Sequence, residues 1–383
     1  MALPERAELR RARWATRIQF AALGTMGGTW GAHIPSVKLH HGLSEFSLSM
    51  VLLAAALGAV SSLLIAGRVV AQLGARRAAA VAGTLMCAMF AIFLPLPGFW
   101  ALLPAAYLFG AGMSVFDVSI NSEGSELESL SGRAIMSNLH GMFSVGAMAG
   151  AAAASALLGA GVAPVIQLAG VALLLTAVML LAGLGMLDTH SGAADETRAT
   201  FVWPRGTLLV IGLLIFAGMM AEGVMYDWCV LYLKQDIGMP QSQAALGYAT
   251  FAGVMAVSRF GGDALRARYS EQGLLLSGGV LAAAAMAVVL LVGSPWVAFI
   301  GFALVGAGLA PVAPILFNAA TRVPGVSRAA AIASVTSIGY SGFMVGPPLI
   351  GSIAQATSLT VGLSVVVVAS TCLAIGAHKV PDE

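Results

Sequence analysis

Two carboxylates lie inside an apolar run in the middle of the chain. The run extends from residue 207 to 233 and contains Glu222 and Asp227, with Tyr226 one helical turn after Glu222. A run of this length can cross a bilayer as one helix. A charged side chain at that depth costs about 2.5–3.5 kcal/mol on insertion scales, so it normally faces the protein interior or a water-filled cavity. We therefore expect this helix to line a polar cavity that other helices enclose.

Glu222 is the first candidate for a proton- or substrate-binding group, because membrane carboxylates commonly serve those purposes. Tyr226 shares its helix face, whereas Asp227 lies about 140° around the axis from Glu222. The alternative for Glu222 is a structural hydrogen bond to a neighbouring helix. For Asp227 the alternatives are an outer gate or an ion pair with Lys38 or Lys234.

A second group of polar residues is expected near the inner ends of two consecutive spans. Asp117 and Asn121 lie one turn apart, and Asn138 and His140 follow the next connection. Histidine changes charge near neutral pH, and a carboxylate partner shifts that titration. Two interpretations are equally compatible with the spacing: a proton relay or polar pocket wall, and a hydrogen-bonded pair that locks two helices.

The composition requires that lipid cover most of the surface. Of the 383 residues, 59% are apolar and only 9% are charged, which is too little charge for a soluble protein of this size. Continuous apolar runs of about 20 residues predict transmembrane helices rather than barrel strands. A net charge of +2 gives no sign of a nucleic-acid partner. We find no phosphate loop, nucleophile motif, metal-ligand spacing or ATP-binding domain, so we expect no enzyme activity and no cofactor.

The apolar runs predict an all-α membrane protein with twelve transmembrane helices. A charged lead, residues 1–17, precedes them, and Glu123, Glu126 and Glu128 are expected in a solvated loop with ordinary ion pairs. The spans lie near 17–37, 46–66, 78–97, 99–121, 136–159, 164–186, 207–232, 243–262, 273–293, 296–320, 330–353 and 359–377.

The basic residues predict the orientation of these spans. With both termini in the cytoplasm, 17 of the 19 Lys and Arg residues lie on the cytoplasmic side. Only Lys38 and Lys234 lie on the outer side of the membrane in this arrangement. Such an excess of basic residues in cytoplasmic loops is what the positive-inside rule describes.

These two lysines also reveal an internal repeat, since they lie 196 residues apart. The same offset relates Trp100 to Trp296, and Leu-x-Gly-Ala-Gly at 108–112 to the same motif at 304–308. The chain is therefore expected to form two six-helix bundles, 1–186 and 207–383, joined by a cytoplasmic linker, 187–206. Parallel repeats of this kind place a binding site near the midplane at their interface.

The repeat adds weaker site candidates. Trp30 occupies the position equivalent to Tyr226, and either covers a substrate ring or packs as an ordinary aromatic. Polar residues of the second half complete the set: Asn318, Ser337 and Tyr340.

The chain resembles the major facilitator superfamily (MFS) of transporters over nearly its whole length. The resemblance rests on the repeat and on the segment 67–77, where Gly67, Gly74, Arg76 and Arg77 match the superfamily's Gly, Asp, Gly-Arg-Lys loop signature. Ala71 replaces the Asp, which departs from the family pattern. The resemblance implies that this loop, and Arg259 and Asp263 in the second half, act as a conformational latch.

Two further segments resemble a narrower group, the YbjJ-like bacterial inner-membrane proteins, which lie near the fucose-permease-type symporters. These segments are Ala-Glu-Gly-x-x-x-Asp-Trp at 221–228 and Met-Ser-x-Leu-His-x-x-Phe-Ser at 136–144. The resemblance implies a monomeric inner-membrane transporter that moves a small solute by alternating access, coupled to a proton gradient, with a sugar-like substrate. Two alternatives remain: a proton-driven exporter of amphipathic compounds, and a membrane sensor or scaffold that does not transport.

Overall fold

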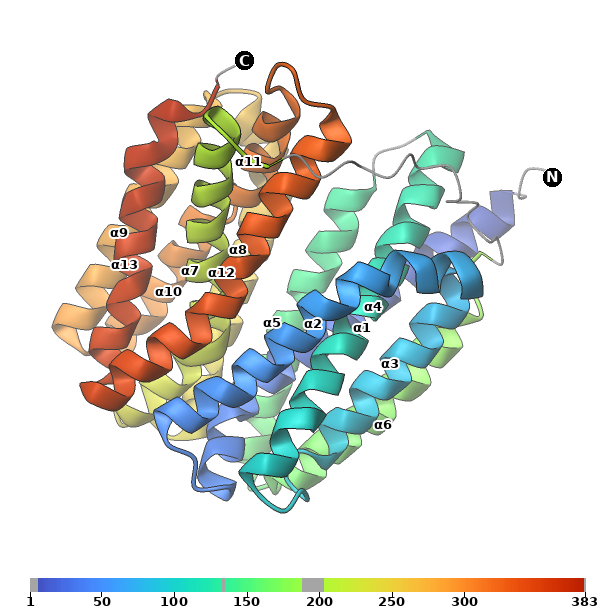
Figure 1. The fold of residues 1–383 in the computed structure, drawn as a ribbon. Coiled ribbons are helices and arrows are strands. Elements are labelled where there is room, and N and C mark those ends of the chain that lie inside the picture. The colour runs from blue at the N-terminus through green and yellow to red at the C-terminus, as the bar shows by residue number, and fades with distance from the viewer. Residues whose placement is uncertain (1–5, 133–134, 188–202, 382–383) are drawn as a thin grey trace. The chain divides into compact units, whose positions relative to one another are not determined.

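The computed structural model describes residues 6–132, 135–187 and 203–381, in which the chain forms helices and no β-strand (Figure 1). Within these ranges the structure describes the backbone but not the side chains of four residues: Ser137, Asp263, Ala264 and Ala329. The helices are α1 (Arg6–His40), α2 (Glu45–Leu73), α3 (Ala75–Ile92), α4 (Phe99–Ser131), α5 (Met136–Gly159), α6 (Pro164–Gly183), α7 (Thr207–Gln235), α8 (Gln241–Arg266), α9 (Glu271–Val292), α10 (Pro295–Leu309), α11 (Val312–Thr321), α12 (Arg328–Ala356), α13 (Leu359–Gly376) and the short η2 (Ala377–Lys379).

This helix order confirms the predicted fold class. The predicted tenth span corresponds to α10 and α11 together, which are separated at Ala310 and Pro311 because proline cannot donate the backbone hydrogen bond that would continue the helix. Within the described ranges, nine helices are long and apolar enough to cross a membrane, with α10 and α11 taken as one. The orientation of the termini stays a prediction.

The charged lead differs from the prediction, because α1 already begins at Arg6. Its Arg, Ala, Leu and Glu residues are strong helix formers. Side-chain contacts hold the extension in place: Ala12 packs in a buried cluster with Leu127 and Leu187, and Arg17 Nε donates to Asn138 Oδ1 of α5 at 2.9 Å.

Two acidic residues after the fourth predicted span are also placed differently from the prediction. The helix α4 continues to Ser131, so Glu123 and Glu128 lie on a helix rather than in a solvated loop. Glu123 is buried and accepts a hydrogen bond from the backbone N–H of Leu187 at 2.7 Å. Glu128 accepts from the backbone N–H groups of Ile135 and Met136, at 2.8 and 3.1 Å. Glu128 thus satisfies backbone donors at the start of α5, and Glu123 satisfies one at Leu187, shortly after the end of α6. The pattern of charges in the sequence does not predict which backbone groups these carboxylates meet.

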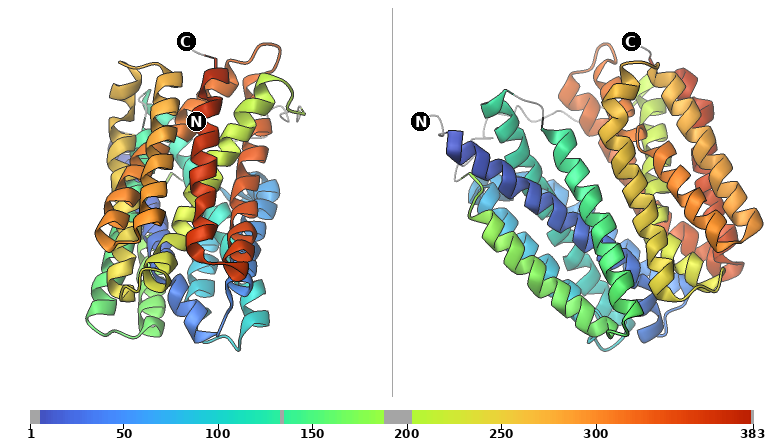
Figure 2. Two further views of the ribbon diagram at one scale, coloured as in Figure 1. Left: turned by 90° about the vertical axis from the view of Figure 1, so that its left-hand side faces the viewer. Right: turned by 180° about the vertical axis from the view of Figure 1, so that it is seen from behind.

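The chain divides into two compact units. The first comprises 1–43 and 50–195, and the second comprises 44–49 and 196–383. The helices of each unit run side by side (Figure 2). In the first unit α1 packs against α4, α5 and α6, and in the second α7 packs against α8, α11, α12 and α13. Helix α7, which carries the two carboxylates, is thus the central helix of its unit.

Close backbone contacts repeat at the offset found in the sequence. In each pair a glycine lies so close to another helix that a Cβ would meet its backbone. The equivalent pairs are Gly110 with Ala55 and Gly306 with Phe251, then Gly112 with Ala82 and Gly308 with Gly278. Each residue of the second unit lies 196 positions after its counterpart. The internal repeat therefore extends from the sequence to the helix packing.

We predict that Gly110→Ala destabilises the first unit, because the new Cβ would overlap the carbonyl group of Ala55 and force α2 and α4 apart. Overpacking of this kind costs about 1–3 kcal/mol. Thermal unfolding of the purified protein would measure the change. Gly170→Ala is the matched control, since Gly170 is exposed on α6 with no atom near the new Cβ. Equal unfolding temperatures for the two variants would contradict this packing argument.

Candidate functional site

The central feature of the second unit is an ion pair between α7 and α8. A side-chain oxygen of Glu222, Oε1, lies 3.0 Å from Nη2 of Arg259. The Arg259 side chain is 20% exposed and that of Glu222 is 16% exposed, so both charges are largely removed from solvent. Each charge compensates the other, which is the usual condition for keeping ionised groups in an apolar bundle.

Tyr226 lies beside this pair, as its place one turn after Glu222 predicts. Its hydroxyl is within electrostatic reach of both Glu222 and Arg259, and it donates to the Met255 sulfur at 3.5 Å. Its ring packs against those of Tyr248 and Phe251, with centroids 5.2 and 5.1 Å away. Aromatic and sulfur contacts from α8 thus fix the orientation of the tyrosine.

The predictions from sequence did not include Arg259 as the partner of Glu222. A signal was present, because Tyr248, Met255 and Arg259 recur at helical spacing and therefore share one face of α8. An arginine on the face that also carries tyrosine and methionine indicates a buried polar contact rather than a surface charge. The latch role of Arg259 stays a prediction.

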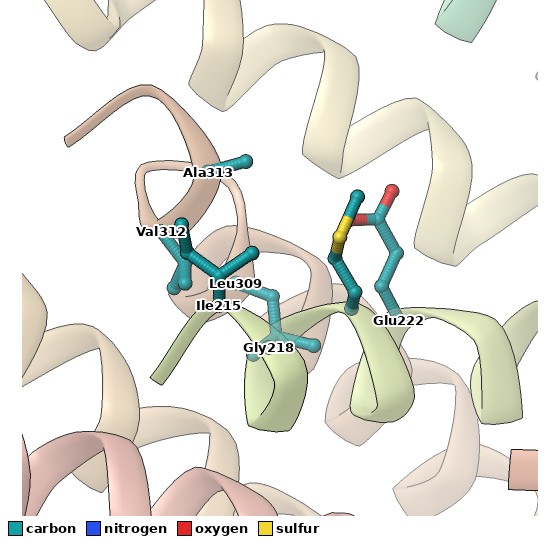
Figure 3. Close-up of a pocket in the computed structure, with 7 residues that line it drawn as sticks. Ile215, Gly218, Glu222, Leu309, Val312 and Ala313 are labelled. Carbon is teal, nitrogen blue, oxygen red and sulfur yellow. The ribbon is translucent and has the colours of Figure 1, made fainter. Parts of the chain in front are cut away.

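A small pocket borders Glu222 on the side of α10 and α11 (Figure 3). Its other lining residues are apolar or glycine: Ile215, Gly218, Met219, Leu309, Val312 and Ala313. Its free volume of about 10 Å³ leaves room for roughly one water molecule. In this conformation the pocket is too small for a sugar or any other organic solute.

Asp227 differs from Glu222 in its contacts within the described part of the chain. It is half-buried on α7, and no hydrogen bond or ion pair to its carboxylate is found within the described residues. The alternative of an ion pair between Asp227 and Lys234 has no support among the described contacts, in which the lysine ammonium donates to Gln241 Oε1 at 3.0 Å. Glu222 has Arg259 as its ionic partner, whereas no such partner of Asp227 is found in the described part of the chain.

The first-unit candidates are not brought together as a relay. Asp117 accepts from the Asn121 side chain at 3.0 Å, and Asn121 is its hydrogen-bond partner among the residues that the structure describes. The His140 ring instead packs edge-on against Phe20 of α1, with centroids 5.3 Å apart. Asn138 accepts from Arg17 of α1. Asp117 and Asn121 thus bond within α4, and the contacts that join helices are those of His140 with Phe20 and of Asn138 with Arg17. The relay and the helix lock both stay predictions.

Trp30 lies in an aromatic cluster rather than alone. Its ring centroid is 5.1 Å from Phe93, 5.9 Å from Phe109 and 6.5 Å from Phe90. This cluster joins α1, α3 and α4 inside the first unit, so the packing interpretation accounts for the residue without a substrate.

Asn318 lies in an ionic cluster with Glu271 and two arginines. Glu271, which is buried, pairs with Arg266 at 2.8 Å and also with Arg322, and Asn318 hydrogen-bonds to this group. The cluster fastens the ends of α8, α9 and α11, and it was not predicted. Its signal was Glu271 at a helix start, within five residues of Arg266.

The last two pocket candidates make local contacts only. The exposed Ser337 hydroxyl donates to the Ala333 carbonyl within α12 at 2.8 Å. The ring of Tyr340 lies 6.3 Å from that of Phe343, on the same helix.

The predicted latch loop forms a tight turn between α2 and α3. Gly74 has a φ of +80° and begins α3 as its N-cap, a conformation that favours glycine. Arg76 is half-buried and Arg77 exposed, while a Cβ at Gly67 would meet open space. The side chain of Asp263 lies outside the described residues, so the latch stays a prediction. No metal-binding group of His, Cys, Asp or Glu is found in the described residues.

Comparisons with known proteins agree with this architecture. The family model of the Major Facilitator Superfamily matches residues 17–347. An uncharacterised MFS-type transporter of Yersinia pestis is 35% identical over 366 residues, covering 96% of this chain and 95% of the relative. The nucleoside transporter NupG has a similar fold, with a TM-score of 0.78, 14% identity and coverage of 97% and 98%. The fucose:proton symporter FucP of E. coli gives a TM-score of 0.61, 17% identity and coverage of 95% and 98%.

We predict that Arg259→Met lowers stability by about 1–3 kcal/mol, because it leaves the Glu222 carboxylate buried without a partner. The double variant Glu222→Gln/Arg259→Met should regain much of that loss, since replacing both partners removes the unpaired charge. Thermal unfolding of the single and double variants would measure this coupling.

Arg328→Met is the matched control, because Arg328 is exposed at the start of α12 and should tolerate the change. The two single variants are Arg259→Met and Glu222→Gln. If their losses in unfolding free energy simply added up in the double variant, the ion pair would make no net contribution to stability.

Proposed function

Because the chain belongs to the Major Facilitator Superfamily, we propose that it is a proton-coupled secondary transporter of a small polar solute. Membership itself establishes a multi-pass membrane protein that transports small molecules and is not an enzyme. Proton coupling, the sugar-like substrate, the bacterial inner membrane and the monomeric state belong to the proposal.

The observation that carries the proposal is the difference between the two carboxylates of α7. Glu222 is neutralised by Arg259 and lies beside the Tyr226 hydroxyl, which together offer an acceptor, a donor and an aromatic face. Such a set suits a solute with hydroxyl groups. No partner of the Asp227 carboxylate is found within the described residues, and a bound proton would neutralise that carboxylate. We therefore assign solute binding to Glu222, Arg259 and Tyr226, and proton binding to Asp227.

The structural neighbours support the substrate class. The two neighbours are named for transport of fucose and of nucleosides, which are both small solutes with several hydroxyl groups. At 14–17% identity they support the fold directly and the substrate only by analogy.

A second candidate is the proton-driven export of amphipathic compounds. It is favoured by the pocket beside Glu222, whose walls are Ile, Met, Leu, Val and Ala around one acid. Apolar walls of this kind bind hydrophobic surface, whereas a sugar requires more polar groups. The ligand screen below separates the two candidates.

The test is a ligand screen by thermal stability at pH 5.5 and 7.5, with sugars, nucleosides and amphipathic cations. A ligand at 100 times its Kd adds about 2.7 kcal/mol of stability, which is readily measured. A sugar or nucleoside supports the proposal and an amphipathic cation supports export. No response in any class would favour a protein that does not transport.

We predict that the ligand found in this screen stabilises the wild type more at pH 5.5 than at pH 7.5, because protonation of Asp227 and solute binding favour each other in a symporter. Asp227→Asn should bind the ligand with equal strength at both pH values. Glu222→Gln should weaken binding at both by about 1–3 kcal/mol, because an ionic acceptor is lost. An unchanged pH dependence in Asp227→Asn would exclude Asp227 as the proton site.

A further inference from the structure

A second cavity lies in the second unit and shares no residue with the pocket beside Glu222. It is a groove of about 220 Å³ between α8, α9 and α10. Its walls include Ser258, Gly262 and Leu265 of α8, Leu274 and Gly278 of α9, and Gly308 of α10. The groove is lined mainly by apolar atoms and small side chains.

Three residues that line the groove differ from their counterparts in the first half of the repeat. The pairs, 196 positions apart, are Ala66 and Gly262, Val81 and Ser277, and Ala82 and Gly278. A Cβ at Gly262 would meet open space, so this wall of the groove is not filled by a side chain. Gly278 instead allows α9 to approach the backbone of α10 at Gly308.

The groove opens to the outer surface of the helices. Leu265 and Leu281 line it and are 44% and 38% exposed, and Ser277 is exposed as well. Leu276 and Val280 beside it are about half exposed. In a multi-pass membrane protein these side chains contact lipid, so hydrocarbon chains have direct access to the groove.

An exposed arginine follows the α8 wall of the groove along the chain. On α8 the residues Ser258, Gly262 and Leu265 follow one face, and Arg268 and Tyr269 come directly after that face at the end of the helix. Both are exposed, and no partner of Arg268 is found within the described residues. The walls run from this end to Leu281, which lies ten residues into α9, or about 15 Å along its axis.

The neighbouring arginines, Arg266 and Arg322, both pair with the Glu271 carboxylate. They are therefore engaged within the protein, whereas Arg268 is exposed. Exposed Arg and Tyr at the end of a transmembrane helix typically lie at the level of lipid headgroups.

We propose that this groove binds one anionic phospholipid of the bilayer, with an acyl chain along α8 and α9 and the phosphate at Arg268. Apolar walls and open access from the membrane account for the chain, and the exposed Arg268 accounts for a negative headgroup. A basic residue near an anionic lipid surface contributes about 1 kcal/mol, so the headgroup contact should favour an anionic lipid about fivefold.

The test uses the full-length protein in bilayer discs that contain equal amounts of phosphatidylglycerol and phosphatidylcholine. Native mass spectrometry would measure which lipid stays bound after gentle release. We expect the wild type to retain one phosphatidylglycerol about fivefold more often than phosphatidylcholine. Arg268→Gln should lose this preference while still retaining a lipid, because the acyl-chain contacts remain.

Gly262→Leu should reduce retention of both lipids, because a Cβ at Gly262 meets open space and the larger side chain would occupy the groove without a clash. Gly261→Leu is its matched control, since Gly261 also faces open space but does not line the groove. Arg328→Gln is the control for charge. Equal retention by Gly262→Leu and Gly261→Leu, or an unchanged preference in Arg268→Gln, would overturn the proposal.

Discussion

Charged groups inside an apolar helix bundle must be compensated within the protein, and the second unit is built around one such compensation. The ion pair between Glu222 and Arg259 joins α7 to α8 at membrane depth. Helix α7 also packs against α11, α12 and α13, so the pair is held from several sides. The Tyr226 hydroxyl is added to the same polar group, and its ring contacts fix it to α8.

The same constraint separates structural from functional polar residues. In the first unit His33 is fully buried, and its ring nitrogens lie 3.0 Å from Gln167 Oε1 and 3.2 Å from Ser36 Oγ. All of these atoms have partners, so they stabilise the contact of α1 with α6. Asp227 is the contrasting case, because its carboxylate is half-buried and unpaired within the described chain. This difference is the basis of the proton-binding role proposed for Asp227.

The repeat supplies the frame, and its departures from symmetry supply the chemistry. Glycine contacts at the same offset bring the helices of each unit to the same close approach. The positions equivalent to Glu222 and Arg259 are Met26 and Leu63, so the first unit has no such pair. Likewise, Gly262, Ser277 and Gly278 line the groove of the second unit at positions where the first unit has alanine or valine. A duplicated bundle thus keeps its packing residues while its polar residues and its cavities differ.

The sequence by itself determined the fold class, the spans and the repeat, because hydrophobic period, length and glycine spacing are local properties of the chain. It also singled out Glu222 and Tyr226, since an acid in an apolar run is conspicuous without any structure. Only the tertiary structure decided which groups meet across helices: Arg259 with Glu222, and Asn318 with Glu271. Pairing of this kind depends on the rotation and depth of each helix within its bundle. Those two quantities follow from the packing of all the helices together, and no single segment of the sequence records them.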